Sequence, residues 1–423
     1  MILTSIYFLA FLICSYTAIN TLYLALFAIA GRIVPSKEPA ELLPVTTFRR
    51  MAVMVPAYRE DSVIVESVLA NLVQTYPRSA YDLIVIADSF QPATLKELAK
   101  LPIRVIEVSF DVSTVAKALR AGMQKLSADG YDVIVVADAD NHMAPDFLDR
   151  VNMAFDEGWR AVQGHRVAKN KNTTVAVLDA ISEEINNHIF RKGHRALGIS
   201  PSFIGSGMAL EYGLMEQYIT QTNDIGGYDK GLDMYVREHD IKIAYLENAL
   251  IYDEKVQTGV VFEHQRTRWI EAHLFYLEKY FFKGIAAFFT GRFDYADKAF
   301  QLFILPRILL LGILSIGVGV SFLFDISWLF QAMGIQLAVL CFVLILSIPG
   351  YLIKLISIKE LVTLPMLFLR FTRSTLNFRK ARNRFLHTPH GIQTKPQDLS
   401  DPAAPSSIPP ITVDPKLSLN NHE

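Results

Sequence analysis

The stretch DVIVVADADNH, residues 132–142, decides the fold class of this 423-residue chain. Its first half is a nearly continuous run of Val and Ile, which is typical of a strand buried on both faces of a parallel sheet. Asp138 and Asp140 follow as the chain leaves this run. Because ligands of open α/β sheets bind at the carboxyl ends of the strands, the stretch predicts both a central strand and the edge of a site.

Three similar apolar runs precede this stretch: AVMVP at 52–56, DLIVIAD at 82–88 and IRVIEVSF at 103–110. The segments between them, such as DSVIVESVLANLVQ and STVAKALRAGMQKLS, carry apolar residues at helical spacing. Strands that alternate with helices predict an α/β sandwich with central parallel strands. A further helix is expected over 173–190, where the sequence leaves open whether Glu183, Glu184 and Asn187 face solvent or an acceptor.

Long apolar segments flank this α/β region. The chain is 51% hydrophobic with a mean hydropathy of +0.27, which predicts a mixed soluble and membrane protein. Residues 2–30 carry no charged side chain, and about 20 residues suffice for a membrane helix. We expect an anchor here and not a cleaved signal peptide, because nothing basic precedes the run and it is too long for a signal core. Stretches 308–324 and 332–353 predict a helical hairpin through the bilayer.

Basic residues set the expected orientation, because Lys and Arg gather on the cytosolic side of membrane spans. They follow the first span at Arg32, Lys37, Arg49 and Arg50, and the last at Arg370, Arg373, Arg379, Lys380, Arg382 and Arg384. The middle domain is therefore expected in the cytosol, at a bacterial inner membrane. Segment 354–369 contains Lys354, Lys359 and Glu360, which favours an interfacial or re-entrant helix over another span.

These patterns divide the chain into six parts. They are a membrane helix at 1–31, a cytosolic α/β domain at 32–270, interfacial helices at 271–300, a membrane hairpin at 301–353, an interfacial and basic segment at 354–388, and a disordered tail at 389–423 rich in Pro, Ser and Asn. Lys and Arg number 41 against 42 Asp and Glu, so no net charge recruits the molecule to nucleic acid.

Asp138 and Asp140 are two residues apart, so one can contact a metal ion directly and the other through water. Carboxylate oxygens are hard ligands, which favours Mg²⁺ or Mn²⁺ over Zn²⁺. The alternative is that both residues simply begin a loop. The two cysteines, Cys14 and Cys341, lie in apolar runs, so neither a disulfide framework nor a cysteine metal site is expected. His142, His165 and His264 lack ligand spacing and are expected to be structural.

Other polar groups fall where a nucleotide could lie over the sheet edge. Asp88 ends a strand and could accept hydrogen bonds from a base or a ribose, or simply cap the strand. Pro56 ends the first strand, and Tyr58 and Glu60 follow in the turn. Lys117 could face a phosphate, although a solvated helix lysine is an open alternative.

These residues occur in one order with two later motifs, Gly205-Ser206-Gly207 and Gln265-Arg266-Thr267-Arg268-Trp269. Over about residues 50 to 270, the chain resembles a family-2 glycosyltransferase. In pattern it is similar to the membrane-embedded synthases that make cellulose, chitin, hyaluronan or poly-N-acetylglucosamine. The resemblance implies a GT-A fold, a UDP-sugar donor, hexosyl or N-acetylhexosaminyl transfer and inversion at the anomeric carbon.

The resemblance also implies roles for the residues. Asp88 would read the uridine, Asp138 and Asp140 would hold the diphosphate and metal, and the Gly205-Ser206-Gly207 turn would lie near the acceptor. Within Gln-x-x-Arg-Trp, Arg268 can neutralise a phosphate, Gln265 can add a hydrogen bond and Trp269 can offer an apolar face to a sugar. The alternative is that Arg268 and Trp269 are interfacial anchors.

One family element departs from expectation. Relatives supply the base that takes the acceptor proton from a Glu-Asp pair ahead of a helix, and here Tyr228 replaces the Glu. Counting back from IKIAYL places Asp229 at the Asp position, whereas counting from Arg237 gives Gly231, with Asp233 nearby. We take Asp229 as the expected base, because Gly226-Gly227 precedes it and can present a helix-start carboxylate. A simple helix cap is the alternative.

Three functions remain open at this level. The first is synthesis of a polysaccharide or oligosaccharide, with export or accessory proteins as partners. The second is transfer of a single sugar to ceramide, diacylglycerol or polyprenyl phosphate. The third is a membrane scaffold or transporter that merely binds nucleotide, but the apolar spans contain almost no polar pathway. The donor sugar and the linkage are not written in any motif.

Overall fold

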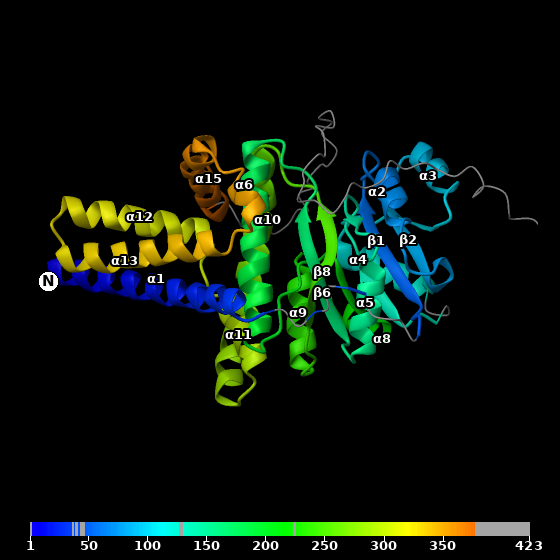
Figure 1. Cartoon of the computed structure of the whole chain (residues 1–423), viewed down its shortest axis with the longest axis horizontal. Coiled ribbons are helices and arrows are strands. Elements are labelled where there is room, and N and C mark those ends of the chain that lie inside the picture. Colours follow the sequence, from blue (N-terminus) through cyan, green and yellow to red (C-terminus); the bar gives the residue numbers. More distant parts are fainter. Residues whose placement is uncertain are drawn as a thin grey trace, which may run out of the picture. The chain divides into compact units, whose positions relative to one another are not determined.

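The computed structural model describes residues 2–35, 38, 41–42, 47–126, 130–222 and 226–376. These residues all belong to one compact unit. The segment 389–423, predicted to be disordered, lies outside the described residues, as do Lys37 and the basic positions from 379 onward. The predicted α/β domain and the predicted apolar helices both fall within the described part (Figure 1).

A sheet of eight strands, as described, runs in the order β3-β2-β1-β4-β7-β6-β8-β5. The four apolar runs of the sequence form β1 to β4, which are parallel neighbours. This confirms the predicted parallel strands. The bounds are β1 Met51–Tyr58, β2 Tyr81–Asp88, β3 Arg104–Val108, β4 Val133–Val136, β5 His142–Met143, β6 Ala161–Ala168, β7 Met208–Glu211 and β8 Ala244–Asp253.

The other half of the sheet was not predicted. Strand β7 is antiparallel to both β4 and β6, and β5 is antiparallel to β8, while β6 and β8 are parallel. The sheet is therefore mixed. Strand β6 reads AVQGHRVA and β7 has only four residues, so neither contains the continuous Val and Ile run that identified the first four strands.

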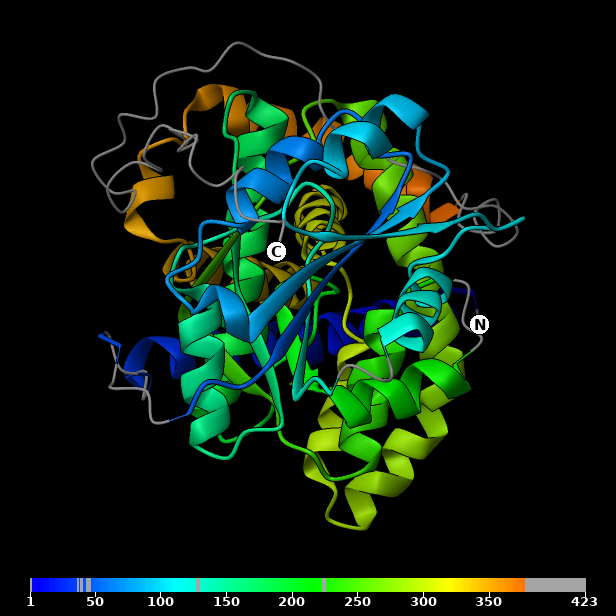
Figure 2. The ribbon, with the colours of Figure 1, turned by 90° about the vertical axis from the view of Figure 1, so that its right-hand side faces the viewer.

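Helices cover both faces of the sheet because alternate residues of a strand point to opposite sides. Val53 of β1 packs with α2, α3 and α5, whereas Met54 packs on the other face with α4, α8 and α9. Both layers can be followed in Figure 2. The bounds are α2 Ile64–Asn71, η1 Arg78–Ala80, α3 Pro92–Leu98, α4 Val115–Leu126, α5 Phe147–Asp156, α8 Tyr212–Gln221 and α9 Tyr228–Glu238.

The helix predicted over 173–190 is α6 (Thr174–Asn186), which continues through a π-helical turn, η2 (Asn187–Gly193), into the short α7 (His194–Ala196). Thr173 caps α6, because its hydroxyl accepts a hydrogen bond from the Ala176 N–H at 3.1 Å. The structure buries Glu183, Glu184 and Asn187. None of them faces solvent.

A single long helix, α10 (Gly259–Phe289), crosses the domain boundary that the sequence placed at residue 270. It is followed by α11 (Phe293–Gln301). The segment predicted to be interfacial or re-entrant forms α15 (Ile358–Leu376), whose Leu367 and Phe371 pack on α10. The Gln-x-x-Arg-Trp motif is therefore held on a helix that joins the α/β domain to the C-terminal helices.

The three predicted membrane segments are helices that pack on one another: α1 (Ile2–Ile33), α12 (Arg307–Leu323) and α13 (Ser327–Leu346). Figure 1 shows them side by side, and the short α14 (Gly350–Ile353) follows. Within the described residues, Thr4–Ile33 and Ser327–Leu346 are long and apolar enough to cross a membrane, while Arg307–Leu323 is apolar but shorter.

Candidate active site

The ends of β1 and β2 bring two predicted donor-binding segments together. Tyr58 pairs with Asp88 in the parallel register, and the N–H of Arg59 donates to the Asp88 carbonyl at 3.1 Å. Asp88 is buried, and its carboxylate accepts a hydrogen bond from the Ser89 hydroxyl at 2.9 Å. Arg59 and Ser89 have φ of 55° and 59°, so the backbone turns sharply where it leaves β1 and again where it leaves β2.

Pro56 lies near the carboxyl end of β1, and Glu60 lies in the turn that follows this strand. Pro56 is buried beside β2, beyond Met54, the last β1 residue that pairs with β4. A proline there costs no ladder hydrogen bond on the β4 side. Glu60 is also buried, and its carbonyl accepts hydrogen bonds from the N–H groups of Val63 and Ile64. The turn after β1 is thus held in one position.

The aspartate pair follows β4, as predicted. The Asp138 N–H donates to the Ser206 hydroxyl at 3.1 Å, and the Gly207 N–H donates to the Val136 carbonyl at 2.8 Å. The Asp140 carboxylate is buried and accepts a hydrogen bond from the Glu254 N–H at 2.9 Å. The end of β4, the glycine turn and the end of β8 therefore meet at one place.

Asp229 lies against the glycine turn. It is the second residue of α9, and Gly227 (φ 66°) stands at the helix cap, so Asp229 is not the cap itself. A Cβ on Gly205 would lie 3.7 Å from the Asp229 Cβ. The Tyr228 hydroxyl donates to the Gly205 carbonyl at 2.6 Å. Burial raises the pKa of Tyr228, and the carboxylates of Asp138 and Asp229 raise it further, so both aspartates lie near this ring.

Asp233, the other carboxylate considered from the sequence, is fully buried one turn further along α9. It forms ion pairs with Arg237 at 2.6 Å and with Lys298 of α11 at 2.5 Å. Burial tends to raise the pKa of Asp233, but these two cations outweigh it and lower the pKa. The Asp233 carboxylate also accepts a hydrogen bond from the Phe203 N–H at 3.1 Å, so Asp233 fastens α9 to α11 and to the segment before the glycine turn.

We expect Asp233→Asn to destabilise the fold by about 3–5 kcal/mol, because it leaves Lys298 and Arg237 buried without their carboxylate. Thermal unfolding in detergent would measure the loss. Asp240→Asn is the matched control, since Asp240 is 80% exposed and pairs with Arg292 only at the surface. An Asp233→Asn variant that unfolds like the wild type but has lost turnover would contradict this structural role.

The Gln-x-x-Arg-Trp motif faces the aspartates from α10. Burial lowers the pKa of Arg268, while Asp138 and Glu60 oppose that shift, so the guanidinium lies near both carboxylates. The side-chain oxygen of Gln265 is buried and has no hydrogen-bond partner among the described residues. Trp269 is 40% exposed, and the Arg266 guanidinium lies 4.0 Å from the centre of its ring. Arg268 is thus the motif residue on which the charge of Asp138 acts.

No described contact brings Lys117, another predicted donor-binding residue, to the aspartates. It is exposed on the first turn of α4, and its ammonium donates to the Val112 carbonyl at 2.7 Å. This matches the solvated helix lysine that the sequence left open as an alternative.

Several charged residues around the site were not predicted from the sequence. Arg266, inside the motif, forms an ion pair with Asp179 of α6. Asp253 at the end of β8 accepts a hydrogen bond from the Asn141 side chain at 3.2 Å, which ties it to the aspartate loop. The one sequence feature that could have indicated Asp253 is the charged run Asp253-Glu254-Lys255 at the end of an apolar stretch. This feature is weak by itself, because charged runs usually lie in solvent.

His165 is structural, as expected. Its ring nitrogens lie 3.0 Å from the Glu184 carboxylate and 2.9 Å from the Glu247 carbonyl. Burial lowers the pKa of His165, but Glu184 and Glu247 more than offset this, so the pKa is raised.

The raised pKa of His165 makes the stability of the fold depend on pH. The pairing of His165 with Glu184 stabilises the fold fully below the unfolded-state histidine pKa of about 6.5, and the stabilisation is lost as pH rises through the folded-state pKa. We therefore expect melting temperature to fall with pH above about 6.5 in the wild type and to fall less in His165→Gln. Parallel profiles of melting temperature against pH would contradict this.

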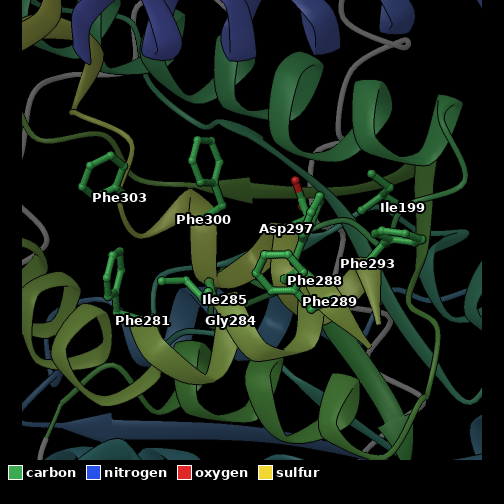
Figure 3. A pocket seen from close by; sticks show the side chains of 12 residues that line it. Ile199, Phe281, Gly284, Ile285, Phe288, Phe289, Phe293, Asp297, Phe300 and Phe303 are labelled. Carbon is green, nitrogen blue, oxygen red and sulfur yellow. The ribbon is translucent and has the colours of Figure 1, made fainter. Parts of the chain in front are cut away.

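A cavity of about 390 Å³ lies elsewhere, between α10 and α11. Figure 3 shows its mostly aromatic lining, which includes Phe281, Phe288, Phe289, Phe293, Phe300 and Phe303. Asp297 is the one charged residue among those that line it, and its carboxylate accepts a hydrogen bond from Tyr23 of α1 at 2.8 Å. No predicted donor-binding residue lines this cavity. The site at the strand ends is therefore separate from it.

The mixed α/β sheet, with paired aspartates after a central strand, places this protein among the GT-A-type enzymes. The chain belongs to the glycosyltransferases: residues 49–272, just over half of it, match the family described as "Glycosyltransferase like family 2". This confirms the family predicted from the motifs. The match does not extend to the membrane-embedded synthase type.

Two known proteins are similar to this chain, one in sequence and one in fold. The chain is 25% identical over 258 residues to the "Probable glycosyltransferase YdaM" of Bacillus subtilis (strain 168), and the match covers 55% of this chain and 58% of that protein. The chain thus spans less than two thirds of this relative. In fold it is similar to the mannosyltransferase PcManGT of Pyrobaculum calidifontis, solved in complex with GDP-Man and Mn²⁺, with a TM-score of 0.53, 16% identity, and coverage of 87% of this chain and 97% of that one.

Proposed function

We propose that this glycosyltransferase uses a UDP-sugar, inverts the anomeric carbon and transfers the sugar to a saccharide acceptor at the membrane, so that it extends a polysaccharide or oligosaccharide. The observation that carries this proposal is the convergence of Asp138, Asp229 and Arg268, from three distant parts of the chain, on one place beside the Gly205-Ser206-Gly207 turn. Donor-binding and proton-accepting groups are needed together in inverting transfer.

In this proposal Asp229 accepts the proton of the acceptor hydroxyl as that oxygen attacks the anomeric carbon. The bond from the anomeric carbon to the diphosphate breaks, and negative charge develops on the departing diphosphate. The guanidinium of Arg268 binds that charge through paired N–H donors. Asp88 binds the nucleoside, and the exposed face of Trp269 contacts a sugar ring.

The residues present suit a divalent ion. Asp138 and Asp140 offer carboxylate oxygens at the end of β4, and Mg²⁺ is commonly bound by one or two carboxylates together with substrate phosphates. Among the described residues, no group of three His, Cys, Asp or Glu could hold a metal ion by itself, so the diphosphate and water would complete the ligands. When bound, Mg²⁺ or Mn²⁺ would neutralise charge on the diphosphate as a Lewis acid.

The membrane location belongs to the same proposal. Helices α1 and α13 have the length and composition of spans, and α12 packs beside α13 as a shorter third. Phe282, Phe288 and Phe289 at the end of α10 are all more than half exposed, which fits contact with the interfacial region of a bilayer. Basic residues after α1 and in α15 support a cytosolic catalytic domain.

A donor screen tests the proposal. The purified chain, in detergent or nanodiscs, is incubated with radiolabelled UDP-sugars and with GDP-mannose, which PcManGT binds. We expect one UDP-sugar to be turned over, EDTA to stop the reaction, and Mn²⁺ or Mg²⁺ to restore it. Turnover of GDP-mannose alone would overturn the donor assignment. Turnover that is unaffected by EDTA would overturn the metal assignment, and no turnover of any nucleotide sugar would overturn the function.

A second candidate is transfer of one sugar to a lipid. Within the described residues only α1, α12 and α13 are available to form a path through the bilayer, which is narrow for a growing polymer. A labelled product that extracts into organic solvent and has the mass of one added sugar would select this candidate. A product of increasing length would select the first.

A further inference from the structure

The loop after β4 contains a buried asparagine directly after the aspartate pair. Asn141 has an exposed fraction of 0%, so no part of its side chain reaches solvent. A carboxamide carries no charge and does not exchange a proton in the physiological range of pH. Asn141 therefore acts on the site only through the hydrogen bonds that it makes.

The side-chain amide of Asn141 uses its full hydrogen-bonding capacity, two accepted bonds and two donated bonds. Its oxygen accepts from the Ser206 hydroxyl and, at 3.4 Å, from the Asp138 N–H. Its nitrogen donates to the Asp140 carboxylate at 3.3 Å and to the Asp253 carboxylate at 3.2 Å. The reverse orientation would place the amide oxygen against two carboxylates, so the hydrogen-bond network settles which atom lies on which side.

The backbone of Asn141 is fixed as well, by helix α2. Its carbonyl accepts hydrogen bonds from the Ser67 hydroxyl at 2.7 Å and from the Asn71 side chain at 2.8 Å. The side-chain oxygen of Asn71 also accepts from the Met143 N–H at 2.7 Å, and both α2 residues are buried. Because its backbone and its side chain are both held, Asn141 presents its amide to the site from one position.

The Asn141 amide lies between two carboxylates that come from distant parts of the chain. Those of Asp140 and Asp253 are within 3.3 Å of the same amide nitrogen. Like charges held so close repel each other, and the two N–H donors of the amide offset part of this repulsion. The Asp140 carboxylate is thus oriented by Asn141 on one oxygen and by the Glu254 N–H on the other, at 2.9 Å.

We infer that Asn141 is a positioning residue, whose side-chain amide holds the aspartate pair and Ser206 of the glycine turn in the arrangement that the donor diphosphate and its divalent ion require. This inference rests on the proposed function, which gives Asp138 and Asp140 the role of holding that ion. A carboxylate that is already oriented loses little conformational freedom when an ion binds. Removal of a group that orients metal ligands typically lowers the affinity for the metal by roughly 10- to 100-fold.

Binding of Mn²⁺ to the full chain in detergent, with UDP and in parallel with GDP, tests this inference. Free Mn²⁺ is measured by electron paramagnetic resonance, with no sugar donor and no acceptor present. We expect Asn141→Ala to raise the dissociation constant for Mn²⁺ by roughly 10- to 100-fold. The affinity for the nucleotide measured in EDTA should stay unchanged, because Asp88 and not Asn141 is proposed to bind the nucleoside.

Asn152→Ala is the matched control, because Asn152 of α5 is also a buried asparagine with both amide atoms bonded. Its oxygen accepts from the Arg49 N–H at 3.1 Å and from the Tyr76 hydroxyl at 3.0 Å, and its nitrogen donates to the Thr47 carbonyl at 2.9 Å. Residues 47 and 49 precede β1, at the end of the sheet opposite to the aspartates. Both variants remove a buried amide and should lower the melting temperature, but only Asn141→Ala should lose affinity for Mn²⁺.

Ser206→Ala keeps the test decisive if Asn141→Ala fails to fold. It removes one donor that holds the Asn141 amide, and it should weaken Mn²⁺ binding by about 5-fold, the effect of one hydrogen bond. Mn²⁺ affinity equal to that of the wild type in Asn141→Ala, or in Ser206→Ala where only that variant folds, would overturn the inference. An equal loss of affinity in Asn152→Ala would also overturn it.

The same measurement separates this inference from the proposed function. A wild type that binds no Mn²⁺ with either nucleotide would remove the ion and the role of Asn141 together. The expected losses of Mn²⁺ affinity in a chain that transfers no sugar would reject the proposed function and leave the role of Asn141 standing. Normal transfer by the wild type, with Mn²⁺ affinity unchanged in Asn141→Ala, would do the reverse.

Discussion

Asp138→Ala is expected to lower turnover of the nucleotide sugar by on the order of 10³-fold, because a bound divalent ion contributes several kcal/mol of charge stabilisation that depends on its carboxylate ligands. Asp138 is half-buried at the end of β4, and its backbone N–H is fixed by Ser206. Initial rates measured at saturating Mn²⁺ would show the loss. The fold should survive, because the substitution leaves that backbone hydrogen bond in place.

Asp132→Ala is the matched control for this experiment. Asp132 is an exposed residue next to the opposite end of β4, where its carboxylate accepts a hydrogen bond from the Arg50 N–H at 2.7 Å. It should retain nearly full turnover. If Asp138→Ala were as active as Asp132→Ala, the diphosphate and the metal ion would have to bind elsewhere, and the proposed donor site would be wrong.

Asp229→Asn should lower the rate by roughly 10²- to 10⁴-fold, the range that a positioned general base supplies. Asparagine keeps the size of the side chain but cannot accept the acceptor proton. The loss should appear in kcat, with little change in the KM for the donor, because the proposed base acts on the acceptor and not on the donor. Steady-state rates with varied donor concentration would separate the two constants.

Asp240→Asn again serves as the comparison, since Asp240 follows the far end of α9 and is 80% exposed. It should not change kcat. Normal kcat in Asp229→Asn would remove Asp229 from the mechanism. A loss confined to KM would instead make it a donor-binding residue.

The position of Asp229 depends on residues that do no chemistry. One turn along α9, Asp233 and Arg237 are fully buried, and Lys298 of α11 pairs with Asp233. Arg237 also donates to the carbonyls of Ser200 and Pro201 at 3.0 and 2.8 Å. These contacts fix α9 to α11 and to the segment before the glycine turn. Helix α11, which follows the α/β domain, therefore helps to hold the proposed base Asp229 in place.

The sequence could predict the parallel half of the sheet because strands buried on both faces need continuous apolar residues. β1, β2 and β4 carry that pattern, and the helices between the first four strands carry the 3.6-residue period. The mixed half could not be predicted in the same way. β6 packs the polar residues Arg166 and Gln163 inward, where Glu183 and the Ser206 carbonyl pair with them. No local pattern records those partners.

The sequence by itself determined the family, the order of the motifs and the strand ends at which Asp88, Asp138 and Asp140 lie. These features depend on short-range patterns, since a strand followed by an acidic loop can be predicted from about ten consecutive residues. Only the tertiary structure set Asp229 against the glycine turn, buried Asp233 between Arg237 and Lys298, and left Lys117 exposed on α4. Those outcomes depend on contacts between residues far apart in the chain, and such contacts exist only once the helices have packed.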